Sequence, residues 1–174
     1  MARADCNTQE KRDDAVISQA LVILSKRLKK PGVLLGSASQ VSHFLRLKLA
    51  TKPHEIFCVI FLDAQNRLVA FEELFYGSLT ELAVIPRQVV IRALAHNAAG
   101  AIFAHNHPSG SAEPSEADKS ITHYLKRALR LVEVKVLDHF VVGGDNVVSF
   151  AARGLMDEAT ERPRLRKVSA KINK

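Results

Sequence analysis

Two stretches near the N-terminus carry apolar side chains at helical spacing. Over residues 13–30 the apolar positions recur every three or four residues, and Pro31-Gly32 ends the run. These positions are Val16, Ile17, Ala20, Leu21, Leu24 and Leu28. A second helix is predicted over residues 39–50, after which Pro53 interrupts the pattern. The sequence therefore predicts a helical N-terminal segment over residues 1–50.

The pattern then changes to apolar runs of the length of β-strands. Residues 55–63, EIFCVIFLD, are almost all apolar, β-branched or aromatic, which is typical of a buried strand. The residues AQN separate this run from a second predicted strand over residues 67–76, which Gly77 ends. This part of the sequence predicts two strands joined by a turn.

Helices and strands alternate in the second half of the chain. Pro86 stands at a first helical position, which tolerates proline, and the predicted helix ends at Gly100. The remaining predicted elements are a strand over 101–104, a helix over 115–131, and strands over 132–142 and 147–150 around a turn. The order ααββαβαββ predicts an α/β domain in which a mixed β-sheet is flanked by helices.

The composition indicates one globular domain in a reducing compartment. The 174 residues are 47% hydrophobic, but no run of about 18 apolar residues predicts a membrane-spanning helix. The N-terminal sequence MARADCNTQEKRDD lacks the apolar segment of a secretory signal. Cys6 lies in this polar segment and Cys58 in an apolar run, so no disulfide framework is predicted. We therefore expect a cytoplasmic protein.

Most of the net charge of +7 lies at the C-terminus. Residues 161–174 contain six Lys or Arg and one Glu, a net +5, which leaves +2 for residues 1–160. A smaller basic cluster, KRLKK, lies at residues 26–30. A basic tail can attract nucleic acid weakly through counterion release, or it can be a solvated end of the chain. Because no aromatic residues are interleaved with the charges, the solvated interpretation is favoured, and we expect residues 157–174 to form a flexible basic tail.

Residues 101–120, AIFAHNHPSGSAEPSEADKS, combine a strand, two histidines, a turn and an acid at the start of a helix. His105 and His107 are two residues apart, so in extended backbone both side chains leave the same face and can reach one metal ion. Asp118, in the first turn of the following helix, can supply a third ligand, with a fourth position open to water as in catalytic zinc sites. Ser115 and Asp118 also have the spacing of a capping box, which by itself gives them a purely structural role.

The stretch HNHPSGSAEPSEAD resembles the JAMM motif of MPN domains: His-x-His, seven residues, Ser, two residues, Asp. His105, His107, Ser115 and Asp118 match each position. The flanking segments ALAHNAAGAIFAHNHPSG and VLDHFVVGGDNVVSF are similar to the bacterial RadC subgroup, and the resemblance extends over most of the chain. It implies an MPN/JAB fold, of cytidine-deaminase-like architecture, over residues 51–156. No helix-hairpin-helix signature precedes it, so the chain is similar to the short RadC-like form.

The resemblance implies a role for each matching residue. His105, His107 and Asp118 would bind one Zn²⁺ per chain, and Ser115 would hydrogen-bond the oxyanion or the bound water. The family also uses a glutamate from a strand before the motif as the general base for the water. In this sequence that glutamate is Glu55.

Glu72 and Glu73 are the alternatives to Glu55 as the base. Glu55 begins a wholly apolar strand, where partial desolvation would raise its pKa towards a useful value. Glu72 and Glu73 are adjacent in a strand, so one of them must face each side of the sheet. Further along the chain, Asp138 is a candidate to support the metal ligands, whereas its neighbour His139 is expected to lie outside the ligand set.

Three functions follow from these features. The resemblance implies a zinc-dependent metallopeptidase or isopeptidase that acts on an unidentified peptide or isopeptide. It also implies a DNA-repair-associated factor, for which the basic tail would provide the nucleic-acid contact. The third is a non-catalytic MPN scaffold, against which the complete motif argues. A deaminase is disfavoured because the chain has no Pro-Cys-x-x-Cys.

Overall fold

The computed structural model describes residues 12–23, 37–77 and 83–157. Residues 12–23 form a helix, and the elements that follow in these ranges are α2 (Ala38–Leu49), β1 (Ile56–Leu62), β2 (Leu68–Tyr76), α3 (Pro86–Ala95), β3 (Gly100–Asn106), α4 (Glu116–Arg130), β4 (Lys135–Gly143) and β5 (Asn146–Ser149). This order confirms the predicted α/β succession. Cys6, the cluster at 26–30 and the predicted basic tail beyond residue 157 lie outside the described residues, so the nucleic-acid contact stays a prediction.

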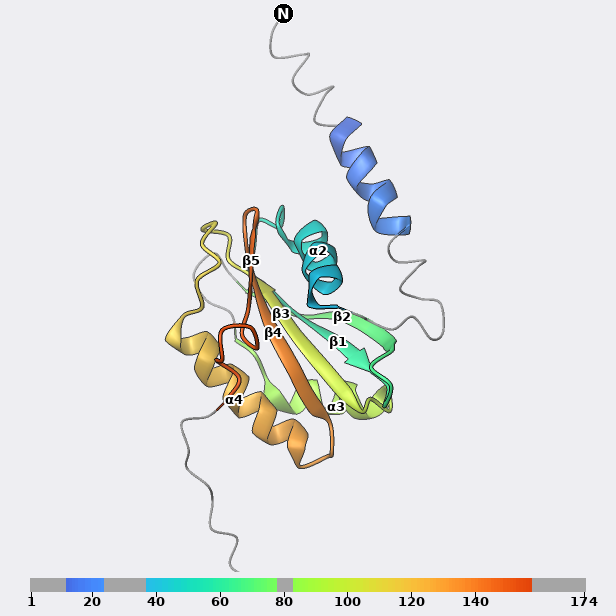
Figure 1. The fold of residues 1–174 in the computed structure, drawn as a ribbon, viewed down its shortest axis with the longest axis vertical. Helices are drawn as coiled ribbons and strands as arrows, with labels where there is room; N and C mark the ends of the chain where they lie inside the picture. Colours follow the sequence, from blue (N-terminus) through green and yellow to red (C-terminus); the bar gives the residue numbers. More distant parts are fainter. Residues whose placement is uncertain (1–11, 24–36, 78–82, 158–174) are drawn as a thin grey trace, which may run out of the picture.

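The five strands form one mixed sheet in the order β2-β1-β3-β4-β5 (Figure 1). β3 and β4 are parallel and are connected through α4, whereas β1 runs antiparallel to both of its neighbours, β2 and β3. In the β1–β3 register Phe57 lies opposite His105. The end of β3 and the beginning of β1 therefore lie side by side at one end of the strands. The first turn of α4 lies next to them.

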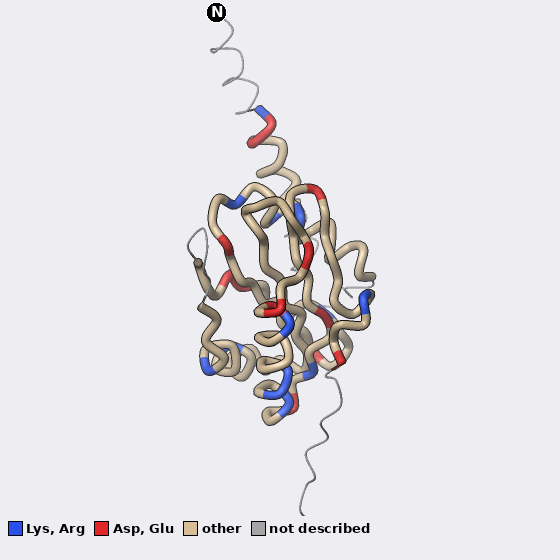
Figure 2. The backbone as a smooth tube through the Cα atoms, turned by 90° about the vertical axis from the view of Figure 1, so that its left-hand side faces the viewer, with Lys and Arg blue, Asp and Glu red and all other residues tan. Residues whose placement is uncertain are grey.

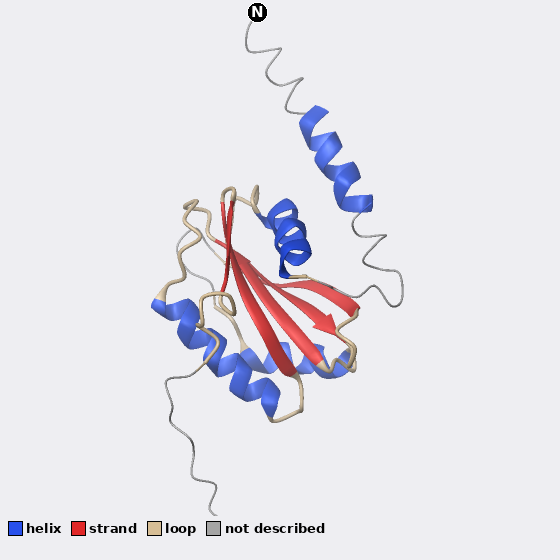
Figure 3. Ribbon diagram, in the orientation of Figure 1, coloured by secondary structure: helices blue, strands red, loops and turns tan. Residues whose placement is uncertain are grey.

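Helices cover both faces of the sheet, with α2 on one face and α3 and α4 on the other (Figure 3). Alternate residues of β1 enter the two cores: Phe57, Val59 and Phe61 pack on the α3/α4 side, and Ile56, Cys58, Ile60 and Leu62 on the α2 side. Because both faces are covered, every residue of β1 is buried. This arrangement explains the unbroken apolar run in the sequence. It also shows that α2, part of the predicted N-terminal segment, packs on the sheet.

β3 is longer than its predicted range. It spans Gly100–Asn106 and includes His105, because its parallel pairing with β4 continues to Asn106 and Val142. The N–H of His107 then donates to the carbonyl of Val142. Both histidines of the motif are thus held by β4, rather than lying in a free loop.

Apolar and charged side chains are distributed as follows over the described residues. None of the described helices combines the length and apolar character needed to cross a membrane. Lys and Arg residues occur on several elements and are interspersed with Asp and Glu (Figure 2). Val16, Val22 and Ile23 of the helix over 12–23 are exposed.

Candidate metal centre

Four side chains from three separate parts of the chain meet at the end of β3. Glu55 precedes β1, His105 lies in β3, His107 follows β3, and Asp118 lies in the first turn of α4. One potential ligand atom from each of the four lies within 4.8 Å of the others. His105 and Asp118 are buried, while Glu55 and His107 are half-buried. The cluster is therefore closed on the side of the core and accessible near Glu55 and His107.

The spacing of the three motif ligands is close to that required by a tetrahedral metal. His105 Nε2 lies 3.0 Å from His107 Nε2 and 3.1 Å from Asp118 Oδ1. His107 Nε2 lies 3.4 Å from Asp118 Oδ2. Ligands at about 2.0–2.1 Å from a tetrahedral zinc ion lie roughly 3.3 Å from one another. The three side chains therefore need only small shifts to share one ion.

The predicted capping box is present and also aims Asp118 at the histidines. Ser115 Oγ accepts the Asp118 backbone N–H at 3.1 Å, and Asp118 Oδ2 accepts the Ser115 backbone N–H at 2.7 Å. The Ser115 hydroxyl also donates to Asp118 Oδ2 at 2.6 Å. With Oδ2 held in this way, Oδ1 faces His105. The structural and metal-binding interpretations of Ser-x-x-Asp are therefore compatible.

The loop after β3 fixes the orientation of His107. Its Nδ1–H donates to the carbonyl of Ser111 at 2.8 Å, which leaves Nε2 free to face the cluster. The loop itself rests on the end of β4 at Gly143. A Cβ there would lie 2.3 Å from both Ala112 N and the Ser111 carbonyl carbon, so only glycine permits this approach.

His105 is held by a residue to which sequence analysis gave no role at the site. Its Nδ1 lies 2.8 Å from Nε2 of His139, which is fully buried in β4. Burial lowers the pKa of His139 well below its usual value, an effect to which the neighbouring His105 adds. Nothing local in the sequence identifies this pair, because only the β3–β4 register brings the two strands together.

The expectation that Asp138 supports the metal ligands was wrong. Its carboxylate accepts the backbone N–H groups of His139 and Ala151 and the hydroxyl of Ser149. These bonds hold the chain at the end of β5. Asp138 therefore stabilises the edge of the sheet, and it is its neighbour His139 that contacts His105.

Asn106, the residue between the two histidines, holds the backbone around Glu55. Its Oδ1 accepts the N–H of Ile56 at 2.9 Å, and its Nδ2 donates to the carbonyl of His54 at 2.9 Å. A longer bond reaches the carbonyl of Lys52 at 3.4 Å. Because His54 and Ile56 flank Glu55, one buried amide places the glutamate beside the histidines. No local pattern in the sequence identifies this role of Asn106.

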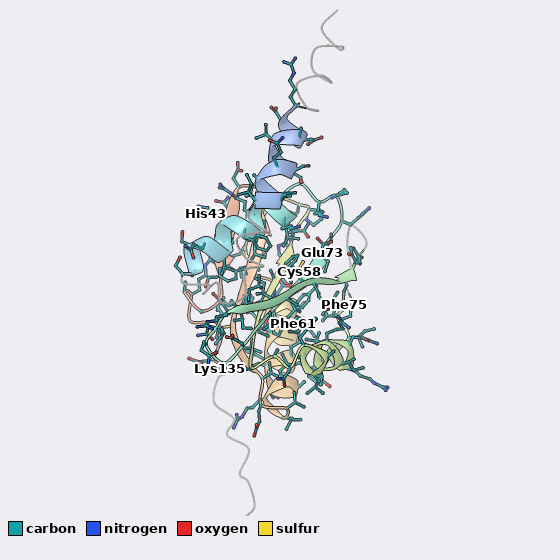
Figure 4. The ribbon with its side chains drawn as sticks, turned by 90° about the vertical axis from the view of Figure 1, so that its right-hand side faces the viewer. His43, Cys58, Phe61, Glu73, Phe75 and Lys135 are labelled. Atoms are coloured by element: carbon teal, nitrogen blue, oxygen red, sulfur yellow. The ribbon has the colours of Figure 1, made fainter. Side chains whose placement is uncertain are left out.

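Glu72 and Glu73 lie outside the cluster and face opposite sides of the sheet, as expected for adjacent strand residues. Glu72 hydrogen-bonds Arg92 of α3 and lies 2.7 Å from Nε2 of His96, the C-cap residue of that helix. Glu73 pairs with Lys52 at 3.6 Å, and Figure 4 shows it on the same side of β2 as Cys58. The structure thus brings Glu55, and neither alternative, next to the motif.

The two carboxylates of the cluster have different electrostatic environments. Burial raises the pKa of Glu55 above its usual value, although His105 and His107 partly oppose this effect. Burial would also raise the pKa of Asp118, but interactions with the neighbouring His105 and His107 outweigh it and hold this pKa well below the usual range. A lowered pKa suits Asp118 to the role of an ionised metal ligand, and a raised pKa suits Glu55 to the role of a base that exchanges protons. Among the described residues, no Lys or Arg hydrogen-bonds or ion-pairs with the four side chains.

Comparison with known proteins agrees with this geometry. A family model described as a RadC-like JAB domain matches residues 35–155. UPF0758 proteins from Nitrosomonas eutropha, Methylibium petroleiphilum and Nitrosospira multiformis are 57%, 58% and 56% identical to the chain over 142 residues. Each match covers 82% of this chain and 63% or 64% of the relative, so the chain spans slightly less than two thirds of their length. The mixed five-stranded sheet with its helices is consistent with a JAB/MPN domain. The chain belongs to the RadC-like JAB domain family.

Proposed function

We propose that this chain is a zinc-dependent hydrolase of amide bonds, a metallopeptidase or isopeptidase, in which Glu55 is the general base. The observation that carries the proposal is the convergence of Glu55, His105, His107 and Asp118 within 4.8 Å. Three of these groups supply a ligand set, and the fourth supplies an acid or base beside it. A site with three protein ligands and one open position is typical of catalytic zinc.

The donor groups fit a divalent cation in both chemistry and charge. His107 has its Nδ1 occupied by a backbone carbonyl, and the Nδ1 of His105 faces His139, so both Nε2 atoms converge on Asp118. When ionised, Glu55 and Asp118 together carry a charge of −2 that no described Lys or Arg neutralises. A divalent cation would neutralise it. Two imidazoles and a carboxylate also suit Fe²⁺, so the metal itself has to be identified.

The side chains around this position have complementary roles in the proposed reaction. A bound zinc ion would polarise the amide carbonyl and lower the pKa of water to about 7. Glu55 would accept a proton from the attacking water and later donate it to the leaving amine, for which its raised pKa is suited. Ser115 would donate to the oxyanion after its hydroxyl rotates away from Asp118 Oδ2. We propose a peptide or isopeptide as the substrate, entering on the accessible side near Glu55 and His107.

The metal site is tested by elemental analysis of the purified protein for zinc, iron and manganese. We expect about one zinc per chain in the wild type and in Glu55→Gln, because Glu55 is not proposed as a ligand. His107→Ala and Asp118→Asn should lose most of the metal. His43→Ala removes an exposed histidine of α2 and is the matched control. Full metal retention after His107→Ala would rule out this site.

The activity is tested by mass spectrometry of a random peptide library and of a library of lysine isopeptides after incubation with the zinc-loaded protein. Wild-type protein should cleave members of one library. Glu55→Gln should lower the rate by about 10²–10⁴-fold while it retains zinc. Glu73→Gln, the same substitution on the neighbouring strand, should cleave normally. Cleavage at the wild-type rate by Glu55→Gln would exclude Glu55 as the base.

A further inference from the structure

A continuous chain of hydrogen bonds leads from His105 into the core and returns to Asp118. His105 Nδ1 lies 2.8 Å from His139 Nε2, and His139 Nδ1 lies 2.6 Å from Thr122 Oγ1. The Thr122 hydroxyl then contacts the backbone carbonyl of Asp118, one turn earlier in α4. His139 and Thr122 are completely buried. Two of the proposed ligands are thus linked through two side chains that do not touch the metal position.

The direction of each hydrogen bond follows from which of these groups carries a hydrogen to donate. A carbonyl oxygen can only accept, so the Thr122 hydroxyl donates to Asp118 and has no proton left for His139. His139 Nδ1 must therefore carry a hydrogen and donate it to Thr122. The rings of Phe57, Phe103 and Phe150 surround His139, with centroids 5.6, 5.8 and 4.7 Å away. This apolar enclosure favours a neutral imidazole.

A neutral His139 with its hydrogen on Nδ1 has a bare Nε2, which can only accept. His105 must then carry a hydrogen on Nδ1, and in its neutral form this leaves Nε2 bare, facing His107 and Asp118. We propose that His139 is a positioning residue which, together with Thr122, fixes His105 in the tautomer that presents Nε2 to a metal ion. The proposal rests on the proposed metal site. The partner is also unusual, because metal-binding histidines commonly donate to a carboxylate, a carbonyl or water.

The tautomers are read from long-range ¹H–¹⁵N spectra of histidine-labelled, metal-free protein, an experiment that requires neither zinc nor activity. We expect both His105 and His139 of the wild type to carry their hydrogens on Nδ1. In Thr122→Val, His139 loses its acceptor, so its hydrogen should move to Nε2 and that of His105 should move to its own Nε2. Thr122→Ser restores the hydroxyl and should restore the wild-type pattern. Ser120→Ala, which removes an exposed hydroxyl from the same helix, should have no effect.

Zinc affinity, measured by chelator competition, separates positioning from packing. His139→Gln retains an acceptor for His105 and a donor for Thr122, so it should bind zinc within about threefold of the wild type. His139→Leu packs well among the phenyl rings but offers no acceptor, and its affinity should fall about 10–100-fold. If His139 only filled space, leucine would be the better substitute and the order would be reversed.

The two sets of data distinguish failure of this proposal from failure of the proposed function. A wild-type protein that binds no zinc would refute the metal site, while the tautomers of the metal-free protein would still decide the role of His139. A wild-type His105 whose Nδ1 carries no hydrogen would overturn the proposal. So would a His139→Leu variant that keeps both the His105 tautomer and the zinc affinity of the wild type.

Discussion

In the part of the chain that the structure describes, two clusters bring histidine and a carboxylate together, and they differ in one respect. On β2 and α3, Glu72 contacts His96 and also forms an ion pair with Arg92. At the end of β3, Asp118 contacts His105 and His107, with Glu55 nearby. The first cluster contains a permanent cation within hydrogen-bond reach of its carboxylate. Among the described residues the second contains none.

This difference distinguishes a structural ion pair from a cluster that could bind a metal ion. Hydrogen bonds from Arg92 lower the pKa of Glu72 to about 2, against the opposing effect of burial, and His96 contributes further. The Glu72 charge is thus compensated by the protein itself. The second cluster places two carboxylates beside imidazoles, which remain neutral when they bind a metal. Its carboxylates have imidazoles and no Lys or Arg as printed partners among the described residues, so we expect the two clusters to respond differently to metal, mutation and pH.

The largest expected difference is the response of stability to zinc. Zinc at 100 times its Kd should raise the free energy of unfolding of the wild type by about 2.7 kcal/mol, because only the folded protein assembles the site. Glu72→Gln should show the same increase, and Asp118→Asn almost none. Thermal unfolding with and without zinc measures the effect. An equal increase in Asp118→Asn would place the zinc outside the second cluster.

The second prediction concerns the loop that carries His107. Gly143→Ala forces a Cβ to within 2.3 Å of the backbone at Ser111 and Ala112, so the loop must shift. We expect a loss of stability of about 1–3 kcal/mol and weaker zinc binding. Gly100 is the first residue of β3, and a Cβ there would meet its nearest atoms at 3.5 Å. Gly100→Ala is therefore the control for substitution of a strand glycine. Unchanged zinc affinity in Gly143→Ala would show that the loop does not position His107.

The third prediction concerns the attachment of Glu55 to the cluster. Asn106→Ala removes the buried amide that bonds Ile56 and His54, which should cost about 1–2 kcal/mol of stability. Amide exchange of Ile56 should accelerate, while the zinc content stays near one per chain because the three ligands are intact. Normal exchange at Ile56 in this variant would contradict the proposed role of Asn106.

The smallest expected effect is the pH dependence of the first cluster. The pKa of Glu72 is lowered in the folded protein, so its ion pair stabilises fully above about pH 4.5 and is lost as the pH falls towards 2. Because the pair is partly exposed, we expect Glu72→Gln to cost only about 1 kcal/mol at pH 6. The difference from the wild type should vanish near pH 2 in urea unfolding. A difference that persists at pH 2 would show that the ion pair is not its cause.

The parts of the site that could be predicted from the sequence are those encoded locally. His105 and His107 are two residues apart in one strand, and Ser115 and Asp118 share one helical turn, so spacing alone relates them. The succession of elements was predictable for the same reason, since each has its own apolar period. Glu55 was named only through the resemblance to a family.

The supporting residues could not be predicted because their contacts span the fold. His139 meets His105 only through the parallel register of β3 and β4, and Asn106 meets Ile56 only across β1 and β3. The adjacent Asp138 was the plausible partner by charge, yet its side chain bonds the end of β5. Chemical type alone does not reveal the face of a strand from which a side chain leaves. The register provides that information.

The most direct measurement is anomalous diffraction at the zinc absorption edge from crystals of the protein grown with equimolar zinc. We expect one peak at about 2.0–2.2 Å from His105 Nε2, His107 Nε2 and an Asp118 oxygen, with the Glu55 carboxylate beside the fourth position but not bonded to the ion. A fourth position occupied by Glu55 itself would indicate a closed structural site. The absence of a peak between these side chains would contradict the metal centre altogether.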